Sequence, residues 1–196
     1  MSSKSDRKRE LILKCAETVF IKKGFSGVTM KDIIEECGIS RGGIYLYYSS
    51  VDDVFIDVIK VHNQNKLENI KRDIDDKTNF EVLLDQYFIL QKQRLLHMEE
   101  SLLLAMFEFY ISHKQEVDTE FLSKAFESLG NVITEILNCG VRSGYVNVND
   151  VQVLAEHMQY CIKGLEVLAM SSGIEEKQLE RQFSYMKKII LKQEGK

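Results

Sequence analysis

Apolar residues recur at three- and four-residue spacings along most of the chain, a pattern typical of amphipathic α-helices. Leu, Glu, Lys, Gln, Met and Ala are frequent, β-branched runs are short, and the 196 residues contain no proline. All of these features favour helix. Hydrophobic residues make up 44% of the sequence, which is enough for a sizeable core. We therefore predict an all-α protein.

Three short helices are expected near the N-terminus. The first is amphipathic, has a basic start and ends at Gly24, because glycine commonly terminates a helix. Thr29 can cap the second, with Asp32 three residues later as a weak capping box. After Gly38, Ser40 can cap a third helix that continues to Tyr47. Two short helices around a glycine-containing turn predict a helix-turn-helix.

Two adjacent glycines, Gly42 and Gly43, lie within the third helix. Glycine inside a helix costs about 1 kcal/mol relative to alanine, so the pair indicates a place where DNA approaches the backbone closely. A frayed turn is the alternative. Beyond it, Ser50 and Asp53 favour the start of a longer fourth helix, to about Arg72. Polar breaks then divide the remainder into four or five helices, at residues 75–79, 112–118, 140–149 and 171–173.

The net charge of −4 argues at first against nucleic acid, since DNA-binding domains usually carry a basic surface. The distribution softens this objection, because residues 1–47 carry +3 and residues 48–196 carry −7. A basic start without a following apolar stretch predicts neither a signal peptide nor a membrane span. We expect a cytoplasmic protein.

Catalytic and metal-binding motifs are missing from the sequence. The histidines form no HExxH pattern and the cysteines no CxxC pair, so neither a metal site nor a cofactor is expected. With no nucleophile beside a base and no phosphate loop, an enzyme is not expected either. The cysteines are interpreted as small buried hydrophobes in preference to redox sensors: Cys15, Cys37, Cys139 and Cys161.

Residues 28–48, VTMKDIIEECGISRGGIYLYY, resemble the N-terminal domain of the TetR family of bacterial transcriptional repressors, and the similarity extends over about residues 8–60. The resemblance implies a three-helix helix-turn-helix domain at 1–49 and a larger helical ligand-binding and dimerisation domain at 50–196. It also implies a ligand-responsive repressor that binds a palindromic operator as a dimer. One residue departs from the family pattern, because Val51 replaces a lysine that usually contacts phosphate. Ser50 could supply that contact.

The candidate DNA contacts divide by what each side chain can reach. Arg41 can pair with the O6 and N7 atoms of guanine, and Leu46 can contact a thymine methyl. The others are expected near phosphate or the groove, although a cap or a solvated charge explains several equally well: Thr29, Lys31, Ser40, Gly42, Gly43, Tyr45, Tyr47 and Ser50. Ile44 and Tyr48 are expected in the core. The basic arm, Arg7 to Arg9, would add attraction that salt weakens.

Two segments beyond the fourth helix are apolar on more than one face, residues 119–142 and 150–170, and the resemblance implies that they form the homodimer. Burial within a monomer is the alternative. Residues 80–111 are rich in aromatic and methionine side chains that could line a pocket for a small apolar or aromatic effector. The candidates are Phe88, Gln91, Leu95, Met98, Met106, Phe107 and Tyr110. Ordinary core packing is again the alternative.

A competing hypothesis is a helical protein-interaction module whose helix-turn-helix is vestigial. The acidic balance and Val51 favour it. Salt-dependent, sequence-selective DNA binding would separate the two hypotheses.

Overall fold

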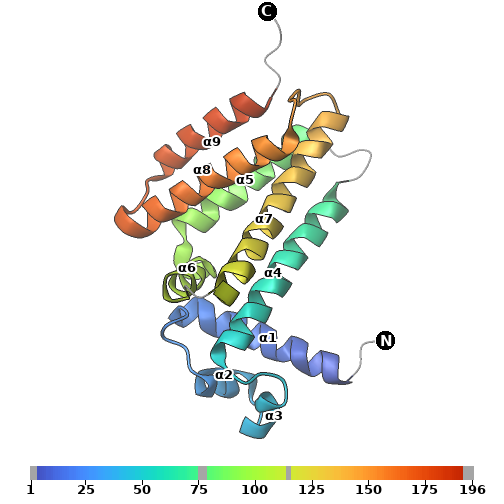
Figure 1. Ribbon diagram of the computed structural model, residues 1–196. Coiled ribbons are helices and arrows are strands. Elements are labelled where there is room, and N and C mark those ends of the chain that lie inside the picture. The colour runs from blue at the N-terminus through green and yellow to red at the C-terminus, as the bar shows by residue number, and fades with distance from the viewer. Residues whose placement is uncertain (1–3, 75–78, 114–115, 192–196) are drawn as a thin grey trace, which may run out of the picture. The chain divides into compact units, whose positions relative to one another are not determined.

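The computed structural model describes residues 4–74, 79–113 and 116–191, and within these ranges every regular element is a helix. The prediction of an all-α protein is therefore confirmed. The chain forms α1 (Lys4–Lys23), α2 (Met30–Cys37), α3 (Arg41–Tyr45), α4 (Val51–Asp73), α5 (Phe80–Leu96), the 3-10 turn η1 (Met98–Glu100), α6 (Leu103–Ser112), α7 (Glu116–Arg142), α8 (Val151–Ser172) and α9 (Glu176–Ile190) (Figure 1).

The break between α5 and α6 differs from the sequence expectation, which treated residues 80–111 as one segment. His97 ends α5, and Ser101 accepts a hydrogen bond from the backbone N–H of Leu103 at 3.3 Å. Because a serine hydroxyl competes with the helical backbone for hydrogen bonds, the polar stretch around η1 interrupts the segment. The described chain beyond α4 therefore holds five α-helices and η1.

The described chain divides into two compact units, Met1–Asn63 with Met98–Ala125 and Gln64–His97 with Phe126–Lys196. Helices α4 and α7 each contribute to both units. These units differ from the predicted division at residues 49 and 50, because α6 belongs with the N-terminal helices. The predicted boundary separates functions rather than packing units and stays a prediction.

An aromatic cluster forms the centre of the first unit. Phe20, Phe55 and Phe109 are fully buried, and the ring centroids of Phe20 and Phe55 lie 4.8 Å apart. Phe25, from the α1–α2 turn, packs edge-on against Phe109 at 5.0 Å. His113, at the end of α6, stacks on Phe109 at 3.9 Å. Aromatic pairs at such distances stabilise beyond the area they bury, so α1, α4 and α6 share one core.

Polar contacts attach α6 to the same unit. The Glu108 carboxylate accepts a hydrogen bond from the backbone N–H of Ser26 at 2.8 Å. Gly24 adopts φ +69, and a Cβ there would lie 2.7 Å from a Glu108 carboxylate oxygen. Nε2 of His113 lies 3.5 Å from the Asp52 carboxylate at the start of α4. The α1–α2 turn and the start of α4 therefore both contact α6.

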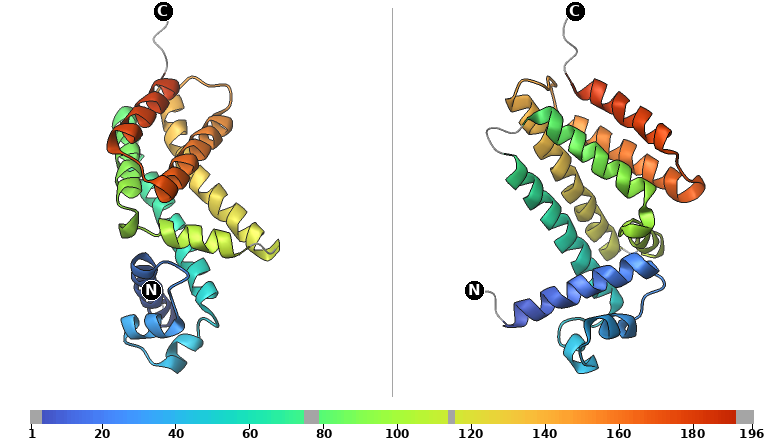
Figure 2. Two further views of the ribbon diagram at one scale, coloured as in Figure 1. Left: turned by 90° about the vertical axis from the view of Figure 1, so that its left-hand side faces the viewer. Right: turned by 180° about the vertical axis from the view of Figure 1, so that it is seen from behind.

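In the second unit, α5 packs against both α8 and α9 (Figure 2). The Lys92 ammonium lies 2.9 Å from the Glu176 carboxylate, and the Phe88 ring stacks on Phe183 at 5.1 Å, so α9 is held by charge and by apolar contact. On the α8 side, Arg94 is paired with the buried Glu166. None of the described helices is long and apolar enough to cross a membrane.

The two segments predicted to form a dimer differ in exposure. Most described apolar side chains of α7 are buried, among them Ile133, Ile136 and Leu137. The side chains of Phe121, Leu122 and Leu129 lie outside the described residues. Helix α8 instead exposes Val153, Tyr160, Val167 and Leu168.

Candidate nucleic-acid interface

Helix α2 begins with the predicted cap. The Thr29 hydroxyl accepts a hydrogen bond from the Asp32 backbone N–H at 3.3 Å, and the Asp32 carboxylate accepts one from the Thr29 backbone N–H at 2.8 Å. A hydrogen bond from Lys23, supported by Thr29, holds the pKa of the Asp32 carboxyl well below its usual range. The capping box is therefore confirmed, with a charged carboxylate as its second member.

The same contacts occupy the Thr29 hydroxyl, which donates to Asp32 Oδ2 at 2.6 Å. A phosphate oxygen would need that donor, so binding it requires the hydroxyl to turn away from Asp32. Thr29 is a cap in this structure, and its contact with phosphate stays a prediction.

Helix α3 is shorter than predicted. Ser40 caps it by accepting a hydrogen bond from the Gly43 backbone N–H at 3.2 Å, but the helix ends at Tyr45 and not at Tyr47. The backbone N–H of Tyr47 bonds three residues back, to Ile44, at 2.9 Å. Glycines lower the helix propensity of so short a segment, so its end tightens into a turn.

The two sides of this recognition helix have opposite environments. Ile44 is fully buried and Tyr48 is 5% exposed, as predicted for core residues. Leu46 is 82% exposed and Tyr45 is 44% exposed. Arg41 is also exposed, with its guanidinium carbon 5.7 Å from the centroid of the Tyr45 ring. The side chains predicted to meet DNA thus lie outside while their neighbours anchor the helix.

The two glycines of α3 serve different purposes. A Cβ at Gly42 would meet nothing within 4 Å, so this exposed position leaves the backbone open to approach. Gly43 is buried, and a Cβ there would lie 3.1 Å from the Ser40 hydroxyl and 3.3 Å from the Lys8 ammonium. A side chain at Gly43 would therefore crowd the ends of the Ser40 and Lys8 side chains, a contact within the protein that the sequence interpretation did not foresee.

The start of α4 is capped from two residues. Ser50 accepts a hydrogen bond from the Asp53 backbone N–H at 3.1 Å, as predicted. The Asp53 carboxylate accepts hydrogen bonds from Ser49, from its hydroxyl and from its backbone N–H. The Ser49 hydroxyl is the main reason that the pKa of Asp53 lies below its usual range. Val51 packs partly buried against the core, so it offers no contact with phosphate.

Arg9 belongs to a polar network that the sequence did not reveal. Its guanidinium lies 2.5 Å from the Asp57 carboxylate and donates to the Tyr48 hydroxyl at 3.2 Å. These hydrogen bonds raise the pKa of Arg9 above its usual range, and burial raises the pKa of Tyr48 to about 12. Arg9 was expected to attract DNA, but Asp57 largely neutralises its charge.

Two other lysines lie beside the recognition helix. A cavity of about 430 Å³ is lined by Lys60 together with Tyr45, Leu46, Tyr47, Tyr48, Ser49, Asp53, Ile56 and Asp57. Lys60 is 61% exposed and only 3.8 Å from Asp57 at its closest, and Lys8 lies beside Gly43. The sequence interpretation missed Lys60 because its position on α4 follows from the fold and from no local motif.

Lys31, by contrast, lies on the exposed face of α2. Its side chain is 82% exposed, and its ammonium lies 3.6 Å from the Glu35 carboxylate one turn later. This pairing fits both alternatives left open by the sequence, a solvated face and a weak phosphate contact.

The predicted pocket residues are divided between the two units. Phe88, Gln91 and Leu95 belong to the second unit, while Met98, Met106, Phe107 and Tyr110 belong to the first. Phe88, Leu95 and Met106 are buried and the other four are half-buried. Gln91 already accepts a hydrogen bond from Arg94 at 2.8 Å. Their role in binding an effector stays a prediction.

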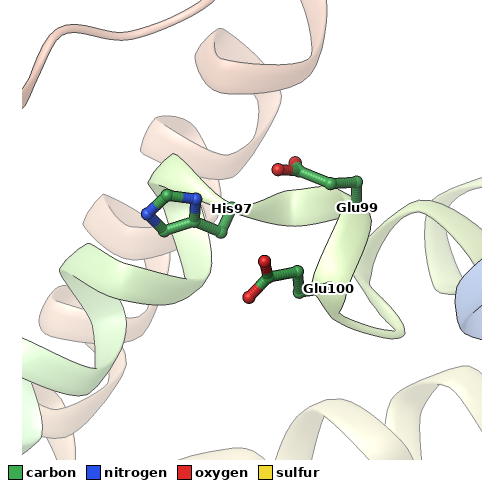
Figure 3. Close-up of side chains that lie close together, drawn as sticks. All are labelled: His97, Glu99 and Glu100. Carbon is green, nitrogen blue, oxygen red and sulfur yellow. The ribbon is translucent and has the colours of Figure 1, made fainter.

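Three exposed side chains cluster in the turn that contains η1: His97, Glu99 and Glu100, whose potential ligand atoms lie within 4.8 Å of one another (Figure 3). All three come from one short stretch of chain and are open to solvent. Exposed acidic groups gather in this way without an ion, so the cluster does not assign a metal site.

A capped helix, a three-residue turn and a short helix with exposed Arg41 and Leu46 over a buried Ile44 define a helix-turn-helix DNA-binding domain. Such domains place the second helix in the major groove.

Comparison with known proteins places this domain in a family. Residues 12–58 match the model of bacterial regulatory proteins of the tetR family. The chain is 29% identical over 140 residues to the uncharacterised HTH-type transcriptional regulator YfiR of Bacillus subtilis (strain 168), covering 71% of this chain and 68% of that protein. The helix-turn-helix domain of this chain therefore matches that of the tetR family, and the chain is similar over most of its length to an HTH-type transcriptional regulator.

Solved structures share the fold at lower identity. A TetR-family regulator from Agrobacterium tumefaciens is 20% identical, with a TM-score of 0.71 over 95% of this chain and 98% of that chain. A SmeT–triclosan complex is 18% identical, with a TM-score of 0.68 over 96% of this chain and 93% of that chain. The curated relatives are named HTH-type transcriptional regulators, which is the class expected from the sequence.

Proposed function

We propose that this chain is a ligand-responsive repressor that binds a palindromic operator as a dimer and leaves it when a small apolar or aromatic effector binds. The observation that carries the proposal is the two-sided recognition helix, with Ile44 buried and with Arg41 and Leu46 exposed. An exposed arginine can bind guanine and an exposed leucine can contact a thymine methyl in the major groove.

Base reading is assigned to Arg41 and Leu46. The guanidinium can form two hydrogen bonds with guanine, worth about 1–3 kcal/mol of discrimination against another base. Leu46 would contact a thymine methyl, and the open surface at Gly42 lets the backbone approach the groove. Tyr45 would donate its hydroxyl to a phosphate at the edge of this surface.

Phosphate contacts fix the position of such a domain without reading sequence. We assign them to Tyr47, Ser50 and Lys31, with Ser40 and Thr29 at the helix caps. Lys8 and Lys60 join them because they lie beside the recognition helix; Lys60 is 61% exposed, and its ammonium lies 3.8 Å from the Asp57 carboxylate. These two lysines would replace the positive charge that Val51 does not provide.

Dimerisation is assigned mainly to α8, within the predicted segment 150–170. Val153, Tyr160 and Val167 recur at seven-residue intervals and are each more than half exposed. Helix α9 adds Tyr185 and Ile189, which are also exposed. We assign this face to a second copy of this chain, because a palindrome is read by two recognition helices about 34–36 Å apart, or a multiple of that distance.

This assignment is tested by the oligomeric state. The double variant Tyr160→Glu with Val167→Glu should sediment as a monomer at equilibrium, since dimerisation would bury two carboxylates per subunit. Glutamate at the exposed Val82 of α5 is the matched control and should leave the dimer intact. A wild-type protein that sediments as a monomer would remove the dimer from the proposal.

The effector is assigned to predicted pocket residues of the second unit: Phe88, Gln91 and Leu95. Apolar lining with one amide suits a hydrophobic ligand that carries a single polar group. A solved structural neighbour is a complex with triclosan, which supports an aromatic ligand by analogy. The effector would act by binding the DNA-incompetent dimer more tightly than the competent one.

DNA binding is tested by selecting bound sequences from random duplexes. The selected operator should be palindromic and its affinity should fall with salt. Arg41→Ala should weaken the best operator and blur its sequence preference, while Lys31→Ala should weaken all sequences alike. Equal losses on every sequence from Arg41→Ala would refute the base-reading role.

The competing hypothesis, a protein-interaction module with a vestigial helix-turn-helix, predicts that no sequence is enriched. The effector is tested separately by titrating aromatic compounds, triclosan among them, against the protein–operator complex. Release of the operator should require a compound that also raises the melting temperature of the free protein.

A further inference from the structure

A histidine and a cysteine lie side by side on α8. Cys161 follows His157 by four residues, and its Sγ atom lies 3.7 Å from Nε2 of His157. His157 is exposed and Cys161 is half-buried, and both belong to the second unit. The pair matches neither HExxH nor CxxC, the patterns on which the sequence prediction of no metal site rested. Neither residue takes part in the proposed binding of DNA or of an effector.

The positions of the two atoms fit a metal ion bound between them. Zinc binds thiolate sulfur at about 2.3 Å and imidazole nitrogen at about 2.0–2.1 Å in tetrahedral sites. Two such ligands at a tetrahedral angle have their sulfur and nitrogen about 3.5 Å apart, close to the 3.7 Å between Cys161 and His157. Ligands four residues apart on a helix lie on the same side of it, so α8 presents both to one ion.

One chain supplies only two of the four ligands that a structural zinc ion takes. Among the residues that the structure describes, the potential ligands that gather in threes are His97, Glu99 and Glu100. No third described His, Cys, Asp or Glu therefore joins His157 and Cys161. A complete site needs ligands from another chain, and a two-fold dimer supplies the same pair again, because its interface joins the same patch of both copies.

The exposed face of α8 is suited to such a contact. Its opposite face packs within the unit, where Glu166 pairs with Arg94 of α5 and Gln159 donates a hydrogen bond to a backbone carbonyl of α7. The structure describes α8 throughout, and its exposed positions between 153 and 168 hold no Asp, Glu, Lys or Arg: Val153, His157, Tyr160, Gly164, Val167 and Leu168. A Cβ at Gly164 would meet nothing within 4 Å, so a second helix can come close there.

We propose that His157 and Cys161 of two chains together bind one zinc ion at the two-fold axis of the dimer. The pair lies near the middle of α8 (Val151–Ser172), where two such helices can cross. Two sulfurs and two nitrogens in a tetrahedral arrangement favour zinc. Each Cys161 thiol loses its proton to solvent as its sulfur binds, and each His157 binds as a neutral imidazole. The ion links the subunits and strengthens the dimer, and the proposal rests on the dimer of the proposed function.

The stoichiometry of zinc binding tests the shared site. The full chain, freed of metal by a chelator, should bind one ion per two chains when it is titrated with zinc chloride in a calorimeter. Cobalt in place of zinc should give the strong visible absorption of a tetrahedral site with thiolate ligands. Cys161→Ser and His157→Gln should each abolish both signals, because each change removes two of the four ligands. Cys37→Ser and His97→Gln are the matched controls and should bind like the wild type.

Sedimentation equilibrium tests the link to dimerisation. Zinc should tighten the wild-type dimer by roughly tenfold or more, since a ligand that binds only the dimer stabilises it, and EDTA should reverse the effect. Cys161→Ser should dimerise equally with zinc and with EDTA. The double variant Tyr160→Glu with Val167→Glu should lose tight zinc binding together with the dimer, although it keeps His157 and Cys161.

Three results would each overturn the zinc site: one ion per chain, full zinc binding in Cys161→Ser or in the monomeric double variant, or a dimer that zinc does not strengthen. Dimerisation is also measured in EDTA, apart from the metal. A wild-type protein that stays a monomer both in zinc and in EDTA therefore refutes the dimer of the proposed function, whereas a dimer that binds no zinc refutes the metal site alone.

Discussion

Charged side chains are exposed at the recognition helix but buried at the contact between α5 and α8. Around α3, the buried positions are apolar and Arg41 is exposed. Between α5 and α8, Glu166 is only 3% exposed and is paired with Arg94 and with Lys163. The difference teaches that an amphipathic pattern reveals an exposed charge, whereas a buried charge becomes intelligible only when its partner is known.

Two neighbouring groups show how strongly the Arg94–Glu166 pair is shielded from water. The Nε atom of Arg94 is buried and has no hydrogen-bond partner, and burial raises the pKa of the nearby Tyr87 hydroxyl above its usual range. Removing a charge from water is expensive, so such a group depends strongly on its partners. The first prediction tests that dependence.

Breaking the Arg94–Glu166 pair should produce the largest effect. Arg94→Met leaves Glu166 buried without its main partner and should lower the free energy of unfolding by about 3–5 kcal/mol. The double variant Arg94→Met with Glu166→Leu should recover most of that loss, because no buried carboxylate remains. Urea unfolding followed by circular dichroism measures both, and a double variant as unstable as the sum of its parts would contradict the coupling.

The second effect compares two neighbours on the recognition helix. Ile44→Ala removes a fully buried side chain and should cost about 2–4 kcal/mol of unfolding free energy. Leu46→Ala should change stability by less than about 0.5 kcal/mol but should weaken the operator at one thymine. A large stability loss from Leu46→Ala would show that this leucine is packed and not free to meet DNA.

The third effect is a loss of stability in alkali. The pKa of Tyr48 rises from 10.0 to about 12 on folding, so between these values the folded chain keeps a proton that the unfolded chain loses. The stability from Tyr48 is therefore present below pH 10 and lost as pH rises toward 12. The unfolding free energy of the wild-type protein should fall as pH rises from 10 toward 12. In Tyr48→Phe this fall should be smaller by roughly 1 kcal/mol.

Tyr87 in the second unit should add to the same alkaline loss, since its pKa is raised in the same direction. Denaturant unfolding at pH 9 and pH 11.5 would compare Tyr48→Phe with Tyr87→Phe. An unchanged pH dependence in both variants would refute the role of burial at these hydroxyls.

The smallest expected effect concerns Lys8 and Lys60. Each glutamine variant should reduce the slope of log affinity against log salt by about 0.9, the value for one phosphate contact. Lys177→Gln, an exposed lysine of α9, is the matched control from the second unit. If neither Lys8→Gln nor Lys60→Gln changes the slope, these lysines do not supply the phosphate contact that Val51 cannot make.

The success of the sequence analysis at the helix-turn-helix has a physical reason. Thr29, Asp32 and Ser40 cap helices within three residues of themselves, and Gly38 ends α2 by its own left-handed conformation. Such signals are local, so the sequence alone predicts them. The length of α3 was overestimated because its last turn depends on a balance between weak helix propensity and packing.

Contacts between distant residues could not be predicted in this way. Arg9 and Asp57 are 48 residues apart, Ser26 and Glu108 are 82 apart, and Arg94 and Glu166 are 72 apart. Nothing near any of these residues indicates its partner, because the partner is chosen by the tertiary fold.

The Glu108 carboxylate, bound to the α1–α2 turn and filling the space beside Gly24, limits how this protein can be recombined with its relatives. A chimera that exchanges only residues 1–49 would place the α1–α2 turn of a relative against Glu108. The residue of that relative at position 25 would replace Phe25 in the contact with Phe109. Exchanging α6 together with the N-terminal helices would keep that contact native. The smallest transplantable DNA-reading module is therefore discontinuous in sequence, and a fragment ending after the first part of α4 would leave its aromatic core open to water.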